Sequence, residues 1–380
     1  MNNHFNVIVI GAGPAGAAAA WRLVKNNLSV CVLEKESLPR GKPCGGGITG
    51  RAMRAMPCDM VQCAGKAFTS VSMNDMSAGL RFTVSRAKPV ITTVLRPMFD
   101  HELVRQAMDA GAELRDKTLV TGLRYGNGCI EVLSGDQRFS ASWVIGADGA
   151  FGKTSQWAGW KKRPRLAPAI NAEIMTPDAI PLHLEQSPRF DFGVIDHGYA
   201  WFFPKQDGCS LGLVSLGKKG ANLSGKLKTY IQTLGFGSAA KPVVSGAAIP
   251  IGPIPGGFVK KRIILTGDAA GLADPLTCEG ISNALKSGTH AAEAIIEGKE
   301  NQRVVEKAYL TMLNDSIISD LKASSILALI IYFHPRIRQF LFARHGQHLC
   351  EAVTDILAGN RSYSRELYSF SNLFRLLTNR

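Results

Sequence analysis

The sequence predicts an α/β protein in which a domain with a parallel sheet is interrupted by a β-rich domain and followed by a helical region. Residues 5–10 and Ser29–Leu33 are short apolar runs typical of buried parallel strands, and the alanine-rich segment Ala15–Leu23 between them has the spacing of a helix. Residues 165–258 alternate apolar and polar positions between glycine and proline breaks, which indicates strands. Everything after about residue 303 is expected to be helical.

The remaining apolar runs extend this pattern. Helices are expected over Asp100–Ala110 and Ser282–Ile296, and buried strands over Trp143–Ile145 and Ile263–Leu265. The domain with the parallel sheet is therefore predicted to be discontinuous, formed by residues 1–65, 95–165 and 259–302. A β-rich substrate domain would comprise 66–94 and 166–258, and the helical C-terminal region 303–380.

Composition limits the classes of function. The chain has 380 residues and a formal net charge of +14, with 46% hydrophobic and 19% charged residues, which suits a globular protein with a sizeable core. A basic surface fits nucleic acid, anionic lipid headgroups or an acidic protein. Because neither a nucleic-acid-binding motif nor a compact Lys/Arg block is present, we expect no nucleic-acid partner.

Eight cysteines are scattered without paired spacing, and Cys58 and Cys63 lack the second pair that a zinc site needs, so no metal is expected. The chain starts directly with a strand rather than a leader, which favours the reducing cytoplasm. The longest apolar run, Ile326–Phe333, is far shorter than the roughly 20 residues that cross a bilayer. Peripheral association with the inner membrane face stays compatible with these features.

A glycine motif, Gly11-Ala12-Gly13-Pro14-Ala15-Gly16, joins the first strand to the first helix. In a Rossmann-type unit Gly11 allows the tight turn, Gly13 lets the backbone approach a pyrophosphate, and Gly16 lets the helix pack on the sheet. The helix start around Ala15 offers free N–H groups to phosphate. Glu34 ends the second strand, where an acid accepts hydrogen bonds from ribose, and we count the adjacent Lys35 with the cofactor-binding residues.

Two further strands end in aspartate turns, at Asp148-Gly149 and at Gly267-Asp268. Together with the N-terminal motif, they resemble in order and spacing the three FAD motifs of the para-hydroxybenzoate-hydroxylase-like flavoproteins. This resemblance implies FAD as cofactor, with Asp268 bonded to a ribityl hydroxyl. Downstream, it places Pro275, Gly280 and Ile281 against the isoalloxazine ring, where a helix start would stabilise negative charge on the reduced ring.

Two stretches resemble the geranylgeranyl reductase family within that class. Residues 39–47 match its P-R-x-K-x-C-G-G segment, which implies that Cys44, Gly45 and Gly46 lie near the flavin, and Arg40 is a candidate phosphate partner. Residues 198–204 match its Y-x-W-x-F-P segment. Since alternate residues of a strand share a face, three rings from this strand would form an apolar wall beside the flavin; they are those of Tyr199, Trp201 and Phe203.

Weaker matches extend the resemblance. Arg96 begins a segment similar to the family's R-x-x-F-D, whose arginine faces the cofactor, and residues 357–363 resemble the G-x-x-x-Y ending of bacterial members. Residues 165–195 match nothing in the family. The resemblance implies an FAD-dependent reductase that saturates carbon–carbon double bonds of an isoprenoid lipid or prenyl side chain. Cys44, Tyr199 and Trp201 are the candidate catalytic residues.

The sequence leaves several alternatives open. A flavin monooxygenase shares all three FAD motifs and would consume oxygen, whereas the W-x-W-x-I-P pattern of flavin halogenases is absent. The cluster-binding cysteines of electron-transfer flavoprotein–quinone dehydrogenases are missing, and a non-catalytic flavin-binding membrane adaptor is a further possibility. No second glycine motif is identified as a site for a resident nicotinamide, so NAD(P)H would bind transiently or a ferredoxin would deliver electrons. Apolar residues interspersed with arginines at 327–344 predict either an interfacial helix pair or a lid on the substrate domain.

Overall fold

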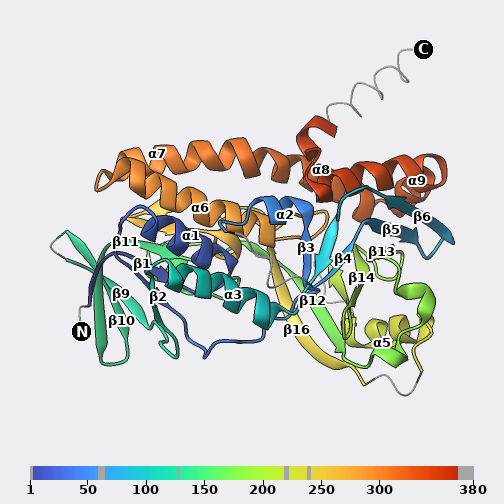
Figure 1. Ribbon diagram of the computed structural model, residues 1–380. Coiled ribbons are helices and arrows are strands. Elements are labelled where there is room, and N and C mark those ends of the chain that lie inside the picture. Colours follow the sequence, from blue (N-terminus) through green and yellow to red (C-terminus); the bar gives the residue numbers. More distant parts are fainter. Residues whose placement is uncertain (1–2, 59–64, 127, 218–221, 238–240, 367–380) are drawn as a thin grey trace, which may run out of the picture.

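The computed structural model describes residues 3–58, 65–126, 128–217, 222–237 and 241–366. Two sheets lie side by side, and a long helical layer runs across both of them (Figure 1). The predicted α/β class with a helical C-terminal region is confirmed. The proposed domain boundaries stay a prediction, although the strands of the first sheet all come from the three stretches assigned to the discontinuous domain.

The first sheet is the parallel one. Its central path runs β17 (Val259–Lys260), β18 (Ile263–Leu265), β11 (Gln137–Gly146), β1 (His4–Ile10), β2 (Val30–Leu33) and β8 (Glu113–Arg115). The antiparallel strands β9 (Gly122–Gly126) and β10 (Cys129–Ser134) extend it beyond β11. Between β18 and β8 all neighbouring strands are parallel, as apolar runs buried on both faces predict.

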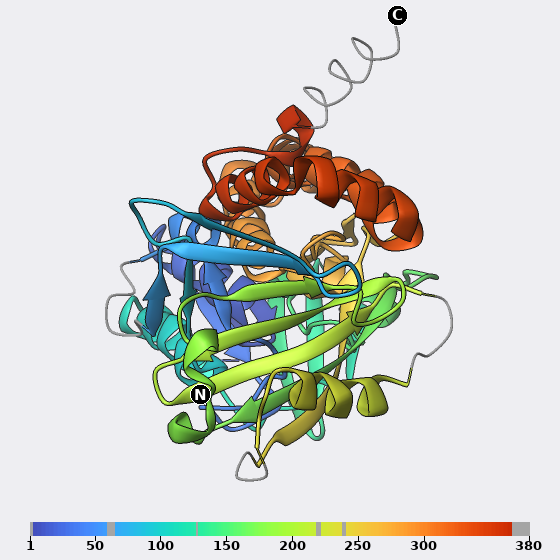
Figure 2. The ribbon, with the colours of Figure 1, turned by 90° about the vertical axis from the view of Figure 1, so that its right-hand side faces the viewer.

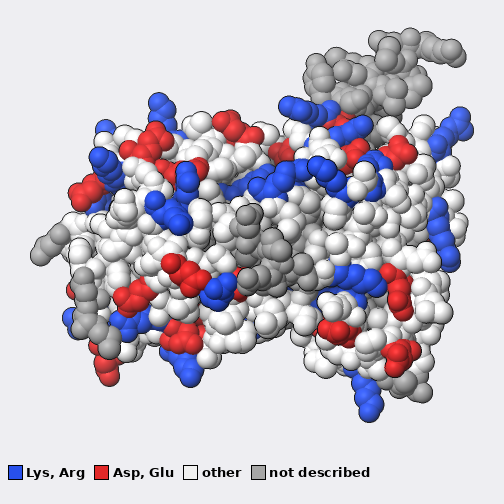
Figure 3. Space-filling model, in the orientation of Figure 1, with Lys and Arg blue, Asp and Glu red and all other residues white. Residues whose placement is uncertain are grey.

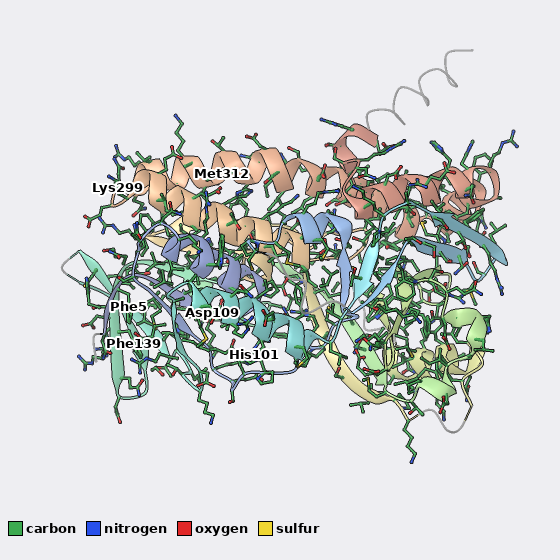
Figure 4. The ribbon with its side chains drawn as sticks, viewed as in Figure 1. Phe5, His101, Asp109, Phe139, Lys299 and Met312 are labelled. Carbon is green, nitrogen blue, oxygen red and sulfur yellow. The ribbon has the colours of Figure 1, made fainter. Side chains whose placement is uncertain are left out.

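Helices α1 (Pro14–Val24), α3 (Arg96–Asp109) and α6 (Ile281–Gly298) pack with this sheet, and α1 contacts both of the others. Phe5 and Phe139, labelled in Figure 4, belong to the hydrophobic core that they share. Helix α3 begins four residues earlier than the expected Asp100. The reason is Pro97, which fits the first helical turn because its missing N–H has no partner to lose there.

The second sheet is mostly antiparallel and runs β16 (Val243–Ile251), β12 (Arg165–Ile174), β15 (Gly208–Ser215), β14 (Gly198–Lys205), β13 (Arg189–Phe192), β5 (Ser70–Asp75) and β6 (Leu80–Ser85). A smaller sheet, β3 (Gly47–Thr49), β7 (Ile91–Thr93) and β4 (Lys66–Phe68), lies beside it. The short helix α2 (Gly50–Arg54) follows β3, and α4 (Thr154–Trp157) follows β11.

Helices cover both faces of the second sheet (Figure 2). Helix α5 (Leu223–Thr233) packs on one face, and α9 (Pro335–Ala358) packs against β5 and β6 on the other. The sequence predicted only strands between residues 165 and 258, so α5 was missed. Its buried apolar residues, Leu227 and Tyr230, span a single turn, which is too short a pattern to stand out from the surrounding alternation.

One continuous helix links the two halves. It comprises α7 (Gln302–Leu313), a π-helical turn (Asn314–Ile318) and α8 (Ser319–Phe333). By length and composition this 32-residue helix would be long and apolar enough to cross a membrane, although 39% of its most apolar window is buried within the protein. Helix α7 packs on α6 in the first core. Helix α8 still contributes Leu321 to that core, and its later residues Ala328 and Tyr332 belong to the core of the second sheet.

Candidate active site

A cleft lies where the parallel strands of the first sheet end and the second sheet begins. It consists of two adjoining cavities, which we call the polar cleft and the aromatic pocket. The polar cleft is lined by Gly11, Gly13, Glu34, Lys35, Arg40 and Asp148, and the aromatic pocket by Cys44, Gly45, Gly46, Arg96, Tyr199 and Trp201. Both share Gly13, Lys42, Gly149 and Asp268, so they are continuous.

The turn at Gly11 forms the floor of the polar cleft. Gly11 has a φ of 104°, and a Cβ there would lie 2.4 Å from the carbonyl oxygen of Ala147, so no other residue fits. Gly13 is the N-cap of α1, and no side chain caps this helix. A Cβ at Gly13 would meet only Arg40 Nη2, at 3.8 Å, so the backbone faces open space. Helical N–H groups that no side chain caps bind phosphate.

A chain of buried charges flanks the cleft. Glu34 accepts a hydrogen bond from the backbone N–H of Ala12 at 3.0 Å and pairs with Arg40 at 3.2 Å. Asp100 pairs with Arg40 at 3.2 Å and accepts two bonds of 2.9 Å from Arg96. Burial alone would raise the pKa of Asp100, but the charge and hydrogen bonds of Arg96 outweigh it and hold that pKa below its usual value.

Asp148, a predicted cofactor-binding residue, lines the polar cleft and is held in place by a neighbouring threonine. Its Oδ2 accepts bonds from the backbone N–H and hydroxyl of Thr154, at 2.9 and 2.8 Å. Its buried Oδ1 has no partner within the described structure, and burial raises the pKa of this carboxyl group. Thr154, which the sequence did not single out, therefore fixes the Asp148 turn, and the carboxyl group of Asp148 lies directly against Gly152.

Asp268 lies between the cavities and pairs with Lys42 at 3.0 Å. Gly267 and Pro275 are buried and line neither cavity, and Gly16 serves the packing of α1 rather than the cleft. Gly280 and Ile281 do line the aromatic pocket, where α6 begins. An 18-residue helix thus points its positive end into the pocket, which favours developing negative charge there.

Aromatic rings form one wall of the pocket. Tyr199 and Trp201 lie on one face of β14 with ring centroids 6.4 Å apart, and Phe190 of β13 lies 5.5 Å from Phe203. The face carrying Ala200 and Phe202 belongs to a different core, so the predicted alternation is confirmed. The sequence did not identify Phe190, because residues 165–195 match no family motif.

The glycine loop lies directly against this wall. A Cβ at Gly45 would lie 2.9 Å from the Phe203 ring and 3.0 Å from Trp201 Nε1, so the close approach requires glycine. Trp201 is 7% exposed, and its buried Nε1 donor has no partner among the described residues. A buried, unpaired donor costs free energy unless a ligand or water accepts its hydrogen bond. An acceptor atom of a bound ligand or of a water molecule would therefore satisfy this donor.

The entry to α6 supplies the opposite side. Tyr199 donates a hydrogen bond to the carbonyl of Thr277, and Arg51 pairs with Asp274 at 3.1 Å and with Glu279 at 2.8 Å. Cys278 lines the pocket. Its backbone has a left-handed φ of 56°, which is unusual for a residue other than glycine. No role was predicted for Arg51 or Cys278 from the sequence, and only their place in the fold reveals them.

Comparison with known proteins decides the family. An FAD binding domain model matches residues 4–183. Digeranylgeranylglycerophospholipid reductase 1 of Methanococcoides burtonii is 30% identical over 342 residues, which cover 81% of this chain and 79% of that protein. The chain belongs to the geranylgeranyl reductase family of FAD-dependent oxidoreductases. The menaquinone reductase of Mycolicibacterium smegmatis is another relative. It is 29% identical over 360 residues, which cover 87% of this chain and 85% of that protein.

Solved structures share the fold of this geranylgeranyl reductase family member. A geranylgeranyl bacteriochlorophyll reductase-like protein from Thermoplasma acidophilum has a TM-score of 0.78 at 22% identity, covering 86% of this chain and 87% of the other. A flavin-dependent brominase has a TM-score of 0.76 at 21% identity, covering 99% and 100%. At these identities the likeness concerns the fold alone.

The residues of the cleft fit FAD. The uncapped start of α1 and the open backbone at Gly13 suit the pyrophosphate, and Glu34 lies at the end of β2, where the ribose of such cofactors is bound. The aromatic pocket, with the unpaired Trp201 donor and the start of α6, suits the ring. Which of the predicted residues touch the cofactor stays a prediction, but apart from Gly16, Gly267 and Pro275 all of them line the cleft.

Proposed function

We propose that the protein uses FAD to saturate carbon–carbon double bonds in the hydrocarbon chain of an isoprenoid lipid or prenyl side chain. The observation that carries the proposal is the pairing of charge around an aromatic pocket. Its charged lining residues each have an ion-pair partner: Lys42 with Asp268, Arg96 with Asp100, and Glu279 with Arg51. Such a pocket offers no counter-charge to an acidic substrate, whereas rings and aliphatic side chains suit a hydrocarbon chain.

The residues would act by alignment and exclusion of water. Tyr199, Trp201 and Phe203 would hold the alkene chain against the loop at Gly45 and Gly46, where bare backbone permits close approach. Reduced FAD, when bound, supplies the hydride for one alkene carbon. The other carbon needs a proton, and Cys44 and Tyr199 are the candidate donors; burial raises the pKa of Tyr199, so its hydroxyl stays protonated.

The relatives support the reductase over the monooxygenase, since those named above are called reductases of a geranylgeranyl lipid and of a menaquinone. We further propose that electrons come from transiently bound NAD(P)H or from a ferredoxin-like donor protein. Residues 45–50 repeat the glycine spacing of Gly11–Gly16, but β3 runs through them, so they do not form a second strand-to-helix turn for a dinucleotide.

The test is anaerobic turnover. The FAD-loaded protein, reduced chemically, is incubated without oxygen with a digeranylgeranyl lipid and with a prenylated quinone, and the products are analysed by mass spectrometry. We expect gain of two hydrogen atoms per reduced double bond in at least one substrate. Turnover that requires oxygen and adds an oxygen atom instead would establish the monooxygenase and reject the proposal.

A further inference from the structure

The corner between α8 and α9 presents large apolar side chains to solvent. Ile326 and Leu329 on α8 are 49% and 53% exposed, and Ile337 and Phe340 on α9 are 47% and 60% exposed. Within each helix the two residues are three positions apart, so they share a face. We call these four residues the apolar corner. A concentration of exposed apolar groups on one element marks an interaction surface more often than scattered ones do.

Other side chains of the same helices are buried against the second sheet. Tyr332 of α8 stacks on Tyr199 with centroids 6.1 Å apart, and Phe342 of α9 packs edge-on against Phe192 at 5.3 Å. Arg338 pairs with the buried Asp75 at 2.9 Å. Helices α8 and α9 therefore pack on the second sheet, as the lid hypothesis predicts. Their buried side chains hold them on the sheet, while the apolar corner faces solvent.

Within the chain segment that carries the corner, the charged side chains are of one sign. Between residues 321 and 350 the sequence contains no Asp or Glu, although the chain has 30 of them. Three cations of this stretch, Lys322, Arg336 and Arg344, are exposed. Lys and Arg side chains appear at the upper right of the molecule, where α9 lies (Figure 3). Apolar side chains flanked by cations are the composition of helices that lie in the interface of an anionic membrane.

We propose that the apolar corner docks on an anionic lipid bilayer, with α8 and α9 lying in the headgroup region and Lys322, Arg336 and Arg344 contacting lipid phosphate. The continuous helix formed by α7 and α8 does not cross the bilayer, because its α7 part is held in the first core by the buried residues Val305, Tyr309 and Leu313. Docking rests on the surface alone and does not depend on the reaction proposed above. It would bring the aromatic pocket within about one helix diameter, ~10 Å, of the lipid.

The test measures binding of the full-length, FAD-loaded protein to vesicles by sedimentation. Vesicles of phosphatidylglycerol mixed with phosphatidylcholine are compared with vesicles of phosphatidylcholine alone, at low and high salt. We expect binding to the anionic vesicles that weakens with salt. The double variant Leu329→Glu/Phe340→Glu should bind at least tenfold more weakly, and Arg336→Glu/Arg344→Glu should lose roughly fivefold or more per reversed charge at low salt.

The matched control is Leu182→Glu. Leu182 is 83% exposed but lies on the short 3-10 turn Leu182–Leu184, whose Leu184 packs in the core on the α5 face of the second sheet. This variant should bind like the wild type, and retained flavin absorbance shows that each variant is folded. Equal binding by wild type and Leu329→Glu/Phe340→Glu would overturn the proposal. So would a dimer in sedimentation velocity without vesicles that the same variant dissociates, since the corner would then bind a second copy.

Discussion

The two ends of the cleft are built by opposite means. The polar cleft is made of backbone and paired charges, with Gly11, Gly13 and the Glu34–Arg40 pair in fixed positions at strand ends. The aromatic pocket is made of side chains from separate elements, including β14, the start of α6 and the C-terminal end of α9. The polar end can therefore hold the same cofactor in many relatives, while the aromatic end can vary with the substrate.

The largest effect is expected at the polar end. Gly11→Ala places a Cβ 2.4 Å from the Ala147 carbonyl oxygen, so the turn must move and FAD affinity should fall at least about a hundredfold, as measured by FAD titration and by visible absorbance. Gly111→Ala is the matched control. Gly111 has a similar φ of 115° but nothing within 4 Å, so the variant should keep its FAD. Equal loss in both would mean that backbone strain alone matters.

Next in size is the charge network. Asp100→Asn leaves Arg96 buried without its counter-charge, which should cost about 3–5 kcal/mol of unfolding free energy in denaturant titration. The exposed Asp109 on the same helix gives the control Asp109→Asn, with little expected change.

The same pair predicts a pH dependence. Because the folded state lowers the pKa of Asp100, its stabilisation is complete above the unfolded pKa of about 4 and is lost as pH falls through the lower folded value. The stability gap between wild type and Asp100→Asn should therefore close in acid. A gap that is constant with pH would contradict this account.

A smaller and more local effect is expected at the aromatic end. Gly45→Ala pushes on Phe203 and Trp201, so turnover should fall roughly tenfold to a hundredfold while FAD stays bound. Gly126→Ala, at the exposed end of β9 with nothing within 4 Å, should leave both unchanged. Release of FAD by Gly45→Ala would contradict this prediction, because the polar cleft and the aromatic pocket would then not act independently.

The smallest effect is expected for Tyr199→Phe. The ring and its packing remain, and only the hydroxyl bond to the Thr277 carbonyl is lost, which is worth about 1 kcal/mol of stability. If Tyr199 is the proton donor, kcat should fall much more than this stability change implies, and single-turnover kinetics of alkene reduction would separate the two.

The sequence predicted the polar end because its chemistry is local. Gly11 to Gly16 and Glu34 lie within a single βαβ unit, whose geometry follows from strand and helix periods. The aromatic end joins residues far apart in the chain. The strand alternation at Tyr199 and Trp201 was predictable, but the contact of Tyr332 with Tyr199 or of Arg51 with Asp274 depends on tertiary packing that no local pattern contains.

The π-helical turn at Asn314–Ile318 sets the rotational phase between α7 and α8. Each residue advances an α-helix by about 100°, so one residue more or fewer at this turn would swing the whole of α8 by more than a quarter of a revolution. Tyr332 would then leave Tyr199, and Ile326 and Leu329 would no longer face outward as they do now. A single inserted or deleted codon at this turn would thus uncouple the substrate end from the flavin end, although it touches neither.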